Sequence, residues 1–89
     1  MGADVTKQLL LEEMVRISDL LYQNNLTAGM KELPGLIQKL AGFANNLKSE
    51  DVPGYTNILK NIMEAMELKD YILLADLLIY EISPLVQSY

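Results

Sequence analysis

The chain has 89 residues, a formal net charge of −5, and neither cysteine nor histidine. This length accommodates one hydrophobic core, so we expect a single domain over residues 1–89. The missing cysteines exclude a disulfide framework and thiolate metal sites, and they suit a reducing cytoplasm. Tryptophan is absent and aromatic residues make up only 7% of a sequence rich in Leu, Ile, Met and Ala, a composition that favours helix over sheet. We therefore expect an all-α protein.

The charged and apolar residues also limit the partners. The seven basic residues are spread along the chain without clustering, which argues against nucleic acid and against electrostatic attachment to an anionic membrane. The apolar run from Tyr71 to Tyr80 has about half the length that a membrane-spanning helix needs. The N-terminus has no signal-peptide pattern. We expect a soluble, cytoplasmic protein.

The first predicted helix runs from about Asp4 or Thr6 to Gln23, and Asn24-Asn25 is expected to end it. Glu12 and Arg16 can pair on its polar surface. Helical spacing gives it a core stripe of Leu10, Met14, Ile17 and Leu21. A second apolar line on the same helix consists of Leu11, Val15 and Tyr22. The helix thus has more apolar surface than one core contact uses.

Two further helices are expected in the middle of the chain. The second can begin at Thr27 and continue to about Leu47, with a kink or an irregular first turn at Pro34. The third starts near Pro53, where a proline suits the first helical turn, and ends near Met66 or Glu67. The very short link to the next helix predicts an antiparallel hairpin.

The last predicted helix, Lys69 to Gln87, is apolar nearly all round, with Asp70 as its cap. One face carries Tyr71, Leu74, Ala75, Leu78, Ile82, Leu85 and Tyr89, and the other carries Leu73, Leu77 and Tyr80. Four such helices with short connections predict an up-down-up-down four-helix bundle. The alternative is a three-helix bundle that is completed by dimerisation.

The segment from Met66 to Glu81 contains the run Lys-Asp-Tyr, then Leu-Leu-Ala-Asp-Leu-Leu, then Tyr-Glu. This run resembles one in short uncharacterised helical proteins of clostridia-like bacteria, and Leu33 to Ile37 is a weaker second match. Together the two matches cover about a third of the chain. The resemblance implies a bacterial, all-helical protein, and it transfers no activity, cofactor or catalytic residue.

Asp76 is the one carboxylate in the middle of the apolar run, at the edge of both faces. The functional interpretation is a buried acid or a polar contact that specifies an interface. The alternative is a boundary residue whose carboxylate lies in water or is hydrogen-bonded to Tyr80 or another hydroxyl. A di-iron or di-manganese site of the bundle type needs Glu-x-x-His pairs, which this sequence cannot supply. We expect no metal, no cofactor and no catalytic residue.

The two second apolar lines are expected to form one surface patch if the first and last helices are neighbours. The patch residues are Leu11, Val15, Tyr22, Leu73, Leu77 and Tyr80. The alternative, purely structural interpretation is that one helix is central, with both of its faces in the core. We predict a non-enzymatic protein–protein interaction module, adaptor or chaperone-like, that forms a homodimer through the first and last helices and binds another protein. The alternatives are a ligand-binding or enzymatic bundle that uses Asp76 with Tyr71 and Tyr80, and an accessory domain of a larger enzyme system.

Overall fold

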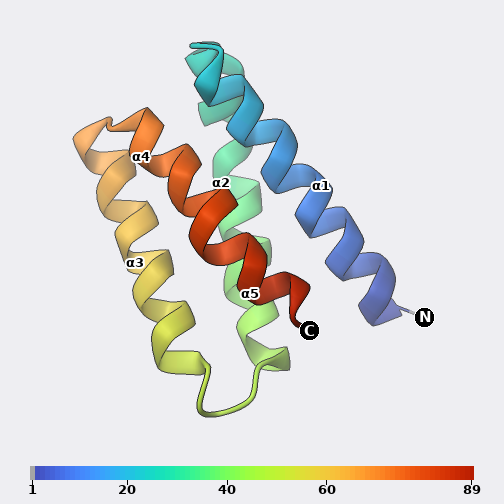
Figure 1. Cartoon of the computed structure of the whole chain (residues 1–89). Helices are drawn as coiled ribbons and strands as arrows, with labels where there is room; N and C mark the ends of the chain where they lie inside the picture. The colour runs from blue at the N-terminus through green and yellow to red at the C-terminus, as the bar shows by residue number, and fades with distance from the viewer. Residues whose placement is uncertain (1) are drawn as a thin grey trace.

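The computed structural model describes residues 2–89, with side chains from residue 7 onward. Four helical segments run up, down, up and down in this part of the chain (Figure 1). They are α1 (Gly2–Tyr22), α2 (Leu26–Phe43), α3 (Val52–Leu68), and a last helix that consists of α4 (Tyr71–Asp76), the π-helical segment η2 (Leu77–Ile82) and α5 (Ser83–Gln87). A short 3₁₀ turn, η1 (Ala44–Asn46), follows α2. The predicted all-α four-helix bundle is confirmed.

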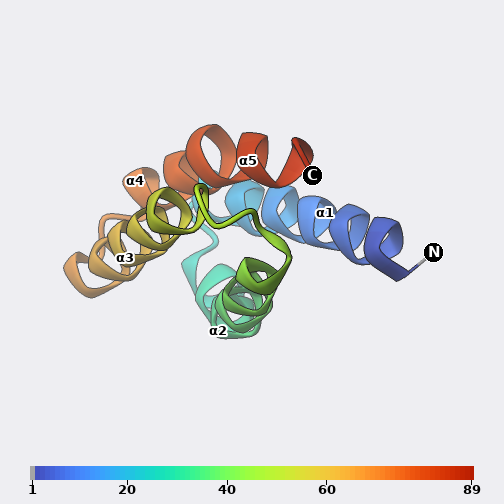
Figure 2. The same cartoon turned by 90° about the horizontal axis from the view of Figure 1, so that it is seen from below.

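The last helix lies between α1 and α3 (Figure 1). It contacts α1 along its length and α3 through α4 and η2. Seen from below, α2 lies under the layer that these three helices form (Figure 2). It packs against α1 and more weakly against α3, which closes the ring of neighbours expected for an antiparallel bundle. The last helix is therefore covered on two sides, which explains why its sequence is apolar over so much of its circumference.

The hydrophobic core draws on every helix. All four residues of the predicted α1 stripe are buried, together with Leu33, Leu36, Leu40 and Phe43 of α2, Tyr55, Ile62 and Ala65 of α3, and Leu74, Ala75, Leu78, Ile82 and Val86 of the last helix. The hydroxyl of buried Tyr55 donates a hydrogen bond to the Leu40 carbonyl at 2.6 Å. This bond satisfies the one polar atom of that side chain, and burial raises its pKa.

The helix ends differ in detail from the sequence expectations. α1 already begins at Gly2, and the side chains of Asp4 and Thr6, expected as caps, lie outside the described side chains. α2 begins at Leu26 and continues through Pro34 as one helix, so Thr27 is not its cap. The Asp70 cap is present, because its carboxylate accepts the Leu73 amide at 3.2 Å. Asn24 and Lys69 end α1 and α3 with φ of 62° and 57°, in the left-handed region.

The centre of the last helix departs from the regular α-helix that the sequence pattern predicts. Across η2 the turns are wider, and the Ser83 amide bonds to the Leu78 carbonyl, five residues earlier. The Ser83 hydroxyl donates to the same carbonyl at 2.7 Å. Pro84, which follows, has no N–H, and in a regular α-helix its ring would collide with the carbonyl of Tyr80. We attribute the π segment to this proline, because a wider turn moves that carbonyl away from the ring.

The described residues, 2–89, include no helix that is both long enough and apolar enough to span a bilayer.

Candidate functional site

The surface between α1 and the last helix is the candidate site. The two helices are antiparallel neighbours and share a boundary along their length (Figure 1). We call this boundary the seam. It contains Leu11, Val15, Asp19 and Tyr22 of α1, and Leu73, Asp76, Tyr80 and Gln87 of the last helix.

Five of the six predicted patch residues are accessible on this surface. Tyr80 is 68% exposed, Val15 49%, Leu73 43% and Tyr22 41%. Leu11 is half-buried. Together these side chains give the seam an apolar character.

Leu77 is a correction to the predicted patch. It is only 9% exposed and belongs to the core cluster, so its side chain is not part of the accessible surface. On a regular α-helix Leu77 would share the face of Leu73. In the structure it opens the π segment, and the central position of the last helix buries Leu77 and Leu78 side by side in sequence. For Leu77, the structural interpretation, in which a central helix has both faces in the core, is the correct one.

Asp76 connects the two sides of the seam. It is half-buried, and the Tyr22 hydroxyl donates a hydrogen bond to its Oδ1 at 2.5 Å. This hydrogen bond, helped by partial burial, raises the pKa of Tyr22 to about 12. Asp76 is thus a boundary residue that accepts a hydroxyl hydrogen bond, as one of the two interpretations expected, and the donor is Tyr22.

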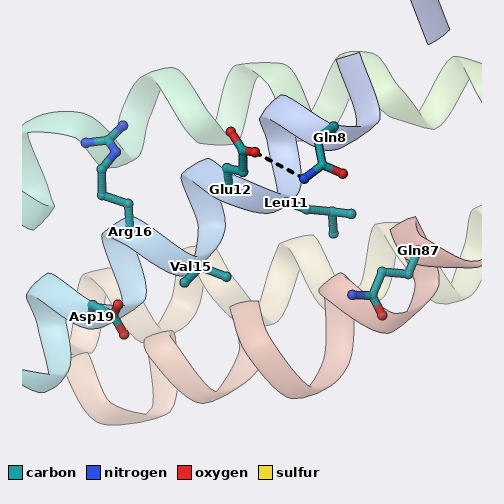
Figure 3. A pocket seen from close by; sticks show the side chains of 7 residues that line it. All are labelled: Gln8, Leu11, Glu12, Val15, Arg16, Asp19 and Gln87. Carbon is teal, nitrogen blue, oxygen red and sulfur yellow. Dashed lines mark hydrogen bonds between the residues drawn. The ribbon is translucent and has the colours of Figure 1, made fainter. Parts of the chain in front are cut away.

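An open groove continues the seam toward the chain ends (Figure 3). Leu11 and Val15 form its apolar part, and they project toward the last helix. Gln87 on α5 faces them from the opposite wall. The remaining lining residues are Gln8, Glu12, Arg16 and Asp19.

The charges around this groove are unequal. Arg16 extends toward α2, where it forms a salt bridge with Glu32 and not the predicted pair with Glu12 (Figure 3). Its guanidinium is held by that carboxylate, which raises the Arg16 pKa. Glu12 instead accepts a hydrogen bond from the Gln8 amide at 3.1 Å. The groove therefore keeps two acidic side chains, Glu12 and Asp19, whereas the charge of Arg16 is balanced by Glu32 of α2.

A neighbouring groove between α1 and α2 has a different character. It contains Leu9, Glu13 and Lys39, and a salt bridge of 2.9 Å joins Lys39 Nζ to Glu13. Because its opposite charges pair across the groove, it presents no net charge to a ligand. The seam groove differs, because Arg16 pairs with Glu32 outside it and leaves the acidic Glu12 and Asp19 on its lining.

Gln8, Asp19 and Gln87 were not among the predicted site residues. In the sequence, Gln8, Glu12, Arg16 and Asp19 recur at helical spacing on α1, and the one signal for a groove is that these polar positions border Leu11 and Val15. The side of the last helix that Gln87 occupies could not be predicted, because it depends on the π segment.

The residues considered for metal or ligand binding lie apart in the structure. Among the described residues, no group of three or more acidic, cysteine or histidine side chains is placed to hold a metal ion. The proposed trio of Asp76, Tyr71 and Tyr80 is not brought into one pocket by hydrogen bonds, because Asp76 is bound by Tyr22 while Tyr71 packs against the core. Tyr80 is largely in solvent.

A protein-family model described as a domain of unknown function (DUF8042) matches residues 7–89. No curated protein and no solved structure matches the chain.

Proposed function

The chain belongs to the DUF8042 family, and we propose that it is a bacterial, cytoplasmic protein–protein interaction module without enzymatic activity. The seam is its contact surface, in an adaptor or chaperone-like role. The observation that carries the proposal is the cluster of exposed Val15, Tyr22, Leu73 and Tyr80 on two adjacent helices. Exposed aromatic and aliphatic side chains on one face are typical of protein interfaces.

We propose a second copy of the chain as one partner, with Tyr22, Leu73 and Tyr80 as the contact. Two symmetry-related copies would bury these side chains against each other, and tyrosine is well suited to such contacts because it combines a large apolar ring with a polar tip. The hydrogen bond from Tyr22 to Asp76 supports this use, since it holds the ring at the surface in one orientation.

Size-exclusion chromatography with light scattering tests the homodimer. Leu73→Glu/Tyr80→Glu places two carboxylates in the contact, and both positions are exposed, so the fold is retained. We expect a dimer for the native protein and a monomer for this variant. Leu77→Glu is unsuitable, because it buries a charge in the core.

Met63→Glu on α3 is the matched control. Met63 is 53% exposed and lies away from the seam, so this variant should remain dimeric. A native protein that stays monomeric at high concentration would contradict the homodimer, as would a dimer that Met63→Glu disrupts and the seam variant leaves intact.

A further inference from the structure

We infer that the seam groove, lined by Leu11, Val15, Glu12, Asp19 and Gln87, binds a basic amphipathic helix of a partner protein. This inference rests on the proposed function as an interaction module and adds the chemistry of the partner. It concerns the end of the seam nearer the chain termini, whereas the dimer contact uses Tyr22, Leu73 and Tyr80.

The apolar part of the groove sets the shape of the ligand. Leu11 and Val15 lie one helical turn apart on α1 and face α5 across the open groove (Figure 3). A groove between two helices accepts the apolar stripe of a third helix, whose anchors recur at helical spacing. The ligand therefore needs apolar residues along one face.

The charges of the groove set the sign of the ligand. Glu12 and Asp19 lie beside the apolar residues, while Arg16 is turned to α2 and paired with Glu32. Lysine or arginine residues flanking the apolar stripe of a bound helix would therefore meet carboxylates.

The backbone carbonyl at the groove wall already has a cationic partner. Gln87 is the last residue of α5, where helix carbonyl groups carry partial negative charge. The Lys7 ammonium group already donates to the Gln87 carbonyl at 3.2 Å. The chain's own ammonium group therefore occupies this carbonyl, and the carboxylates of Glu12 and Asp19 set the sign of the ligand.

A second copy of this chain does not have the required charge. The net charge is −5, and its seven basic residues are dispersed with no basic helical face. Two copies joined through their grooves would bring Glu12 and Asp19 of one copy toward the same acidic side chains of the other, and like charges disfavour that contact.

Fluorescence anisotropy with synthetic peptides tests this inference. The probe is a labelled amphipathic peptide with leucine at i, i+3, i+4 and i+7 and lysine at the flanking positions, and its partner probe carries glutamate in place of lysine. We expect the lysine peptide to bind, with an affinity that falls as salt rises, and the glutamate peptide not to bind.

Variants of the protein locate the binding site. Glu12→Lys/Asp19→Lys should weaken binding of the lysine peptide by roughly tenfold or more, since two favourable charge contacts become repulsive. Val15→Asp should weaken it by a similar factor through the apolar part. Glu64→Lys/Glu67→Lys makes the same charge change on α3 and should leave affinity within roughly twofold.

The outcomes separate this inference from the homodimer. Three results would overturn the groove assignment. They are an equal loss of peptide affinity in the α1 and α3 charge variants, equal binding of both peptides, and no binding of the lysine peptide. Leu73→Glu/Tyr80→Glu should still bind the lysine peptide while monomeric. A native monomer that binds this peptide at the groove would contradict the dimer and uphold the groove.

Discussion

Ser18 and Ser83 are both buried, but their hydroxyl groups are in different situations. Ser83 donates to the Leu78 carbonyl at 2.7 Å, whereas the Ser18 hydroxyl is buried without a hydrogen-bond partner. A buried hydroxyl that lacks a partner costs free energy, while a bonded one contributes modestly to stability. The two serines should therefore respond oppositely to removal of the hydroxyl.

We predict that Ser18→Ala raises the free energy of unfolding by about 1 kcal/mol and that Ser83→Ala lowers it by about 1 kcal/mol. Alanine fits both positions because it only removes an atom. Urea denaturation followed by circular dichroism measures both changes. Destabilisation of similar size in both variants would show that the Ser18 hydroxyl is satisfied in solution.

Tyr22 should titrate anomalously, because its pKa is raised from 10.0 to about 12 by the hydrogen bond to Asp76. A raised pKa in the folded state means that this contact stabilises the fold fully below pH 10.0, and that the contribution is lost as pH rises from there to about 12. Asp76→Asn should return the Tyr22 pKa toward its ordinary value, since the hydrogen bond to the Asp76 carboxylate is the main cause of the raised pKa.

The ultraviolet absorbance of tyrosinate measures this titration, and the difference between the native protein and Tyr22→Phe isolates the Tyr22 component. Tyr80→Phe is a useful comparison, because it removes another seam hydroxyl and leaves the Tyr22–Asp76 pair intact. A Tyr22 component that titrates at the ordinary value in the native protein would contradict the hydrogen bond.

At the scale of the element, Lys69 ends α3 in the left-handed region, with φ of 57°. A side chain other than asparagine or glycine is strained there, so Lys69→Gly should stabilise the protein by about 1 kcal/mol. Asn24→Gly, at the end of α1 with φ of 62°, should gain less because asparagine tolerates this conformation. Paired denaturation curves test the order, and a larger gain at Asn24 would contradict it.

The buried face of a helix could be predicted from the sequence wherever the spacing of apolar residues alone decides burial. The α1 core stripe is correct at Leu10, Met14, Ile17 and Leu21, because α1 is a regular helix with one core-facing side. On α3 the pattern is less reliable, since the apolar Met63 is largely exposed, whereas Ala65 is buried. A small residue such as Ala65 gives a weak signal in an apolar pattern.

The last helix shows where sequence periodicity stops being informative. A regular wheel places Leu85 in the core and Leu77 outside, whereas Val86 and Leu77 are the buried residues. The shift from Leu85 to Val86 follows η2, because wider turns rotate every later side chain. Leu77 is buried because the last helix lies between α1 and α3. The seam could thus be predicted up to Asp76, while its groove, with Gln87 on one wall, required the structure.

At the scale of the whole molecule, Tyr89 ties the end of the chain to the connector between α2 and α3. Its hydroxyl accepts a hydrogen bond from the Lys48 amide at 2.9 Å and donates one to the Asp51 carboxylate. Its ring packs edge-on against Phe43, with centroids 6.2 Å apart. Two segments far apart in sequence are thus held together by one side chain.

We predict that Tyr89→Phe lowers the denaturation midpoint and speeds hydrogen exchange of the Lys48 amide, since the ring contact remains but both hydrogen bonds are lost. Nuclear magnetic resonance of the exchanging amides measures the local effect. Tyr80→Phe, at an exposed position of the last helix, should change neither quantity. Unchanged protection at Lys48 in Tyr89→Phe would contradict the bridge.

The π segment also bears on how this chain can change in length. A π turn holds one residue more than an α turn between hydrogen-bonded groups, so η2 is equivalent to a one-residue insertion in an otherwise regular helix. A homologue one residue shorter between 77 and 82, and without proline at position 84, would bury the same side chains on either side of the deletion. An alignment gap at η2 would therefore indicate that a homologue has an α-helix in place of the π segment, with the same core residues. A gap elsewhere in the last helix would rotate the residues after it away from the core.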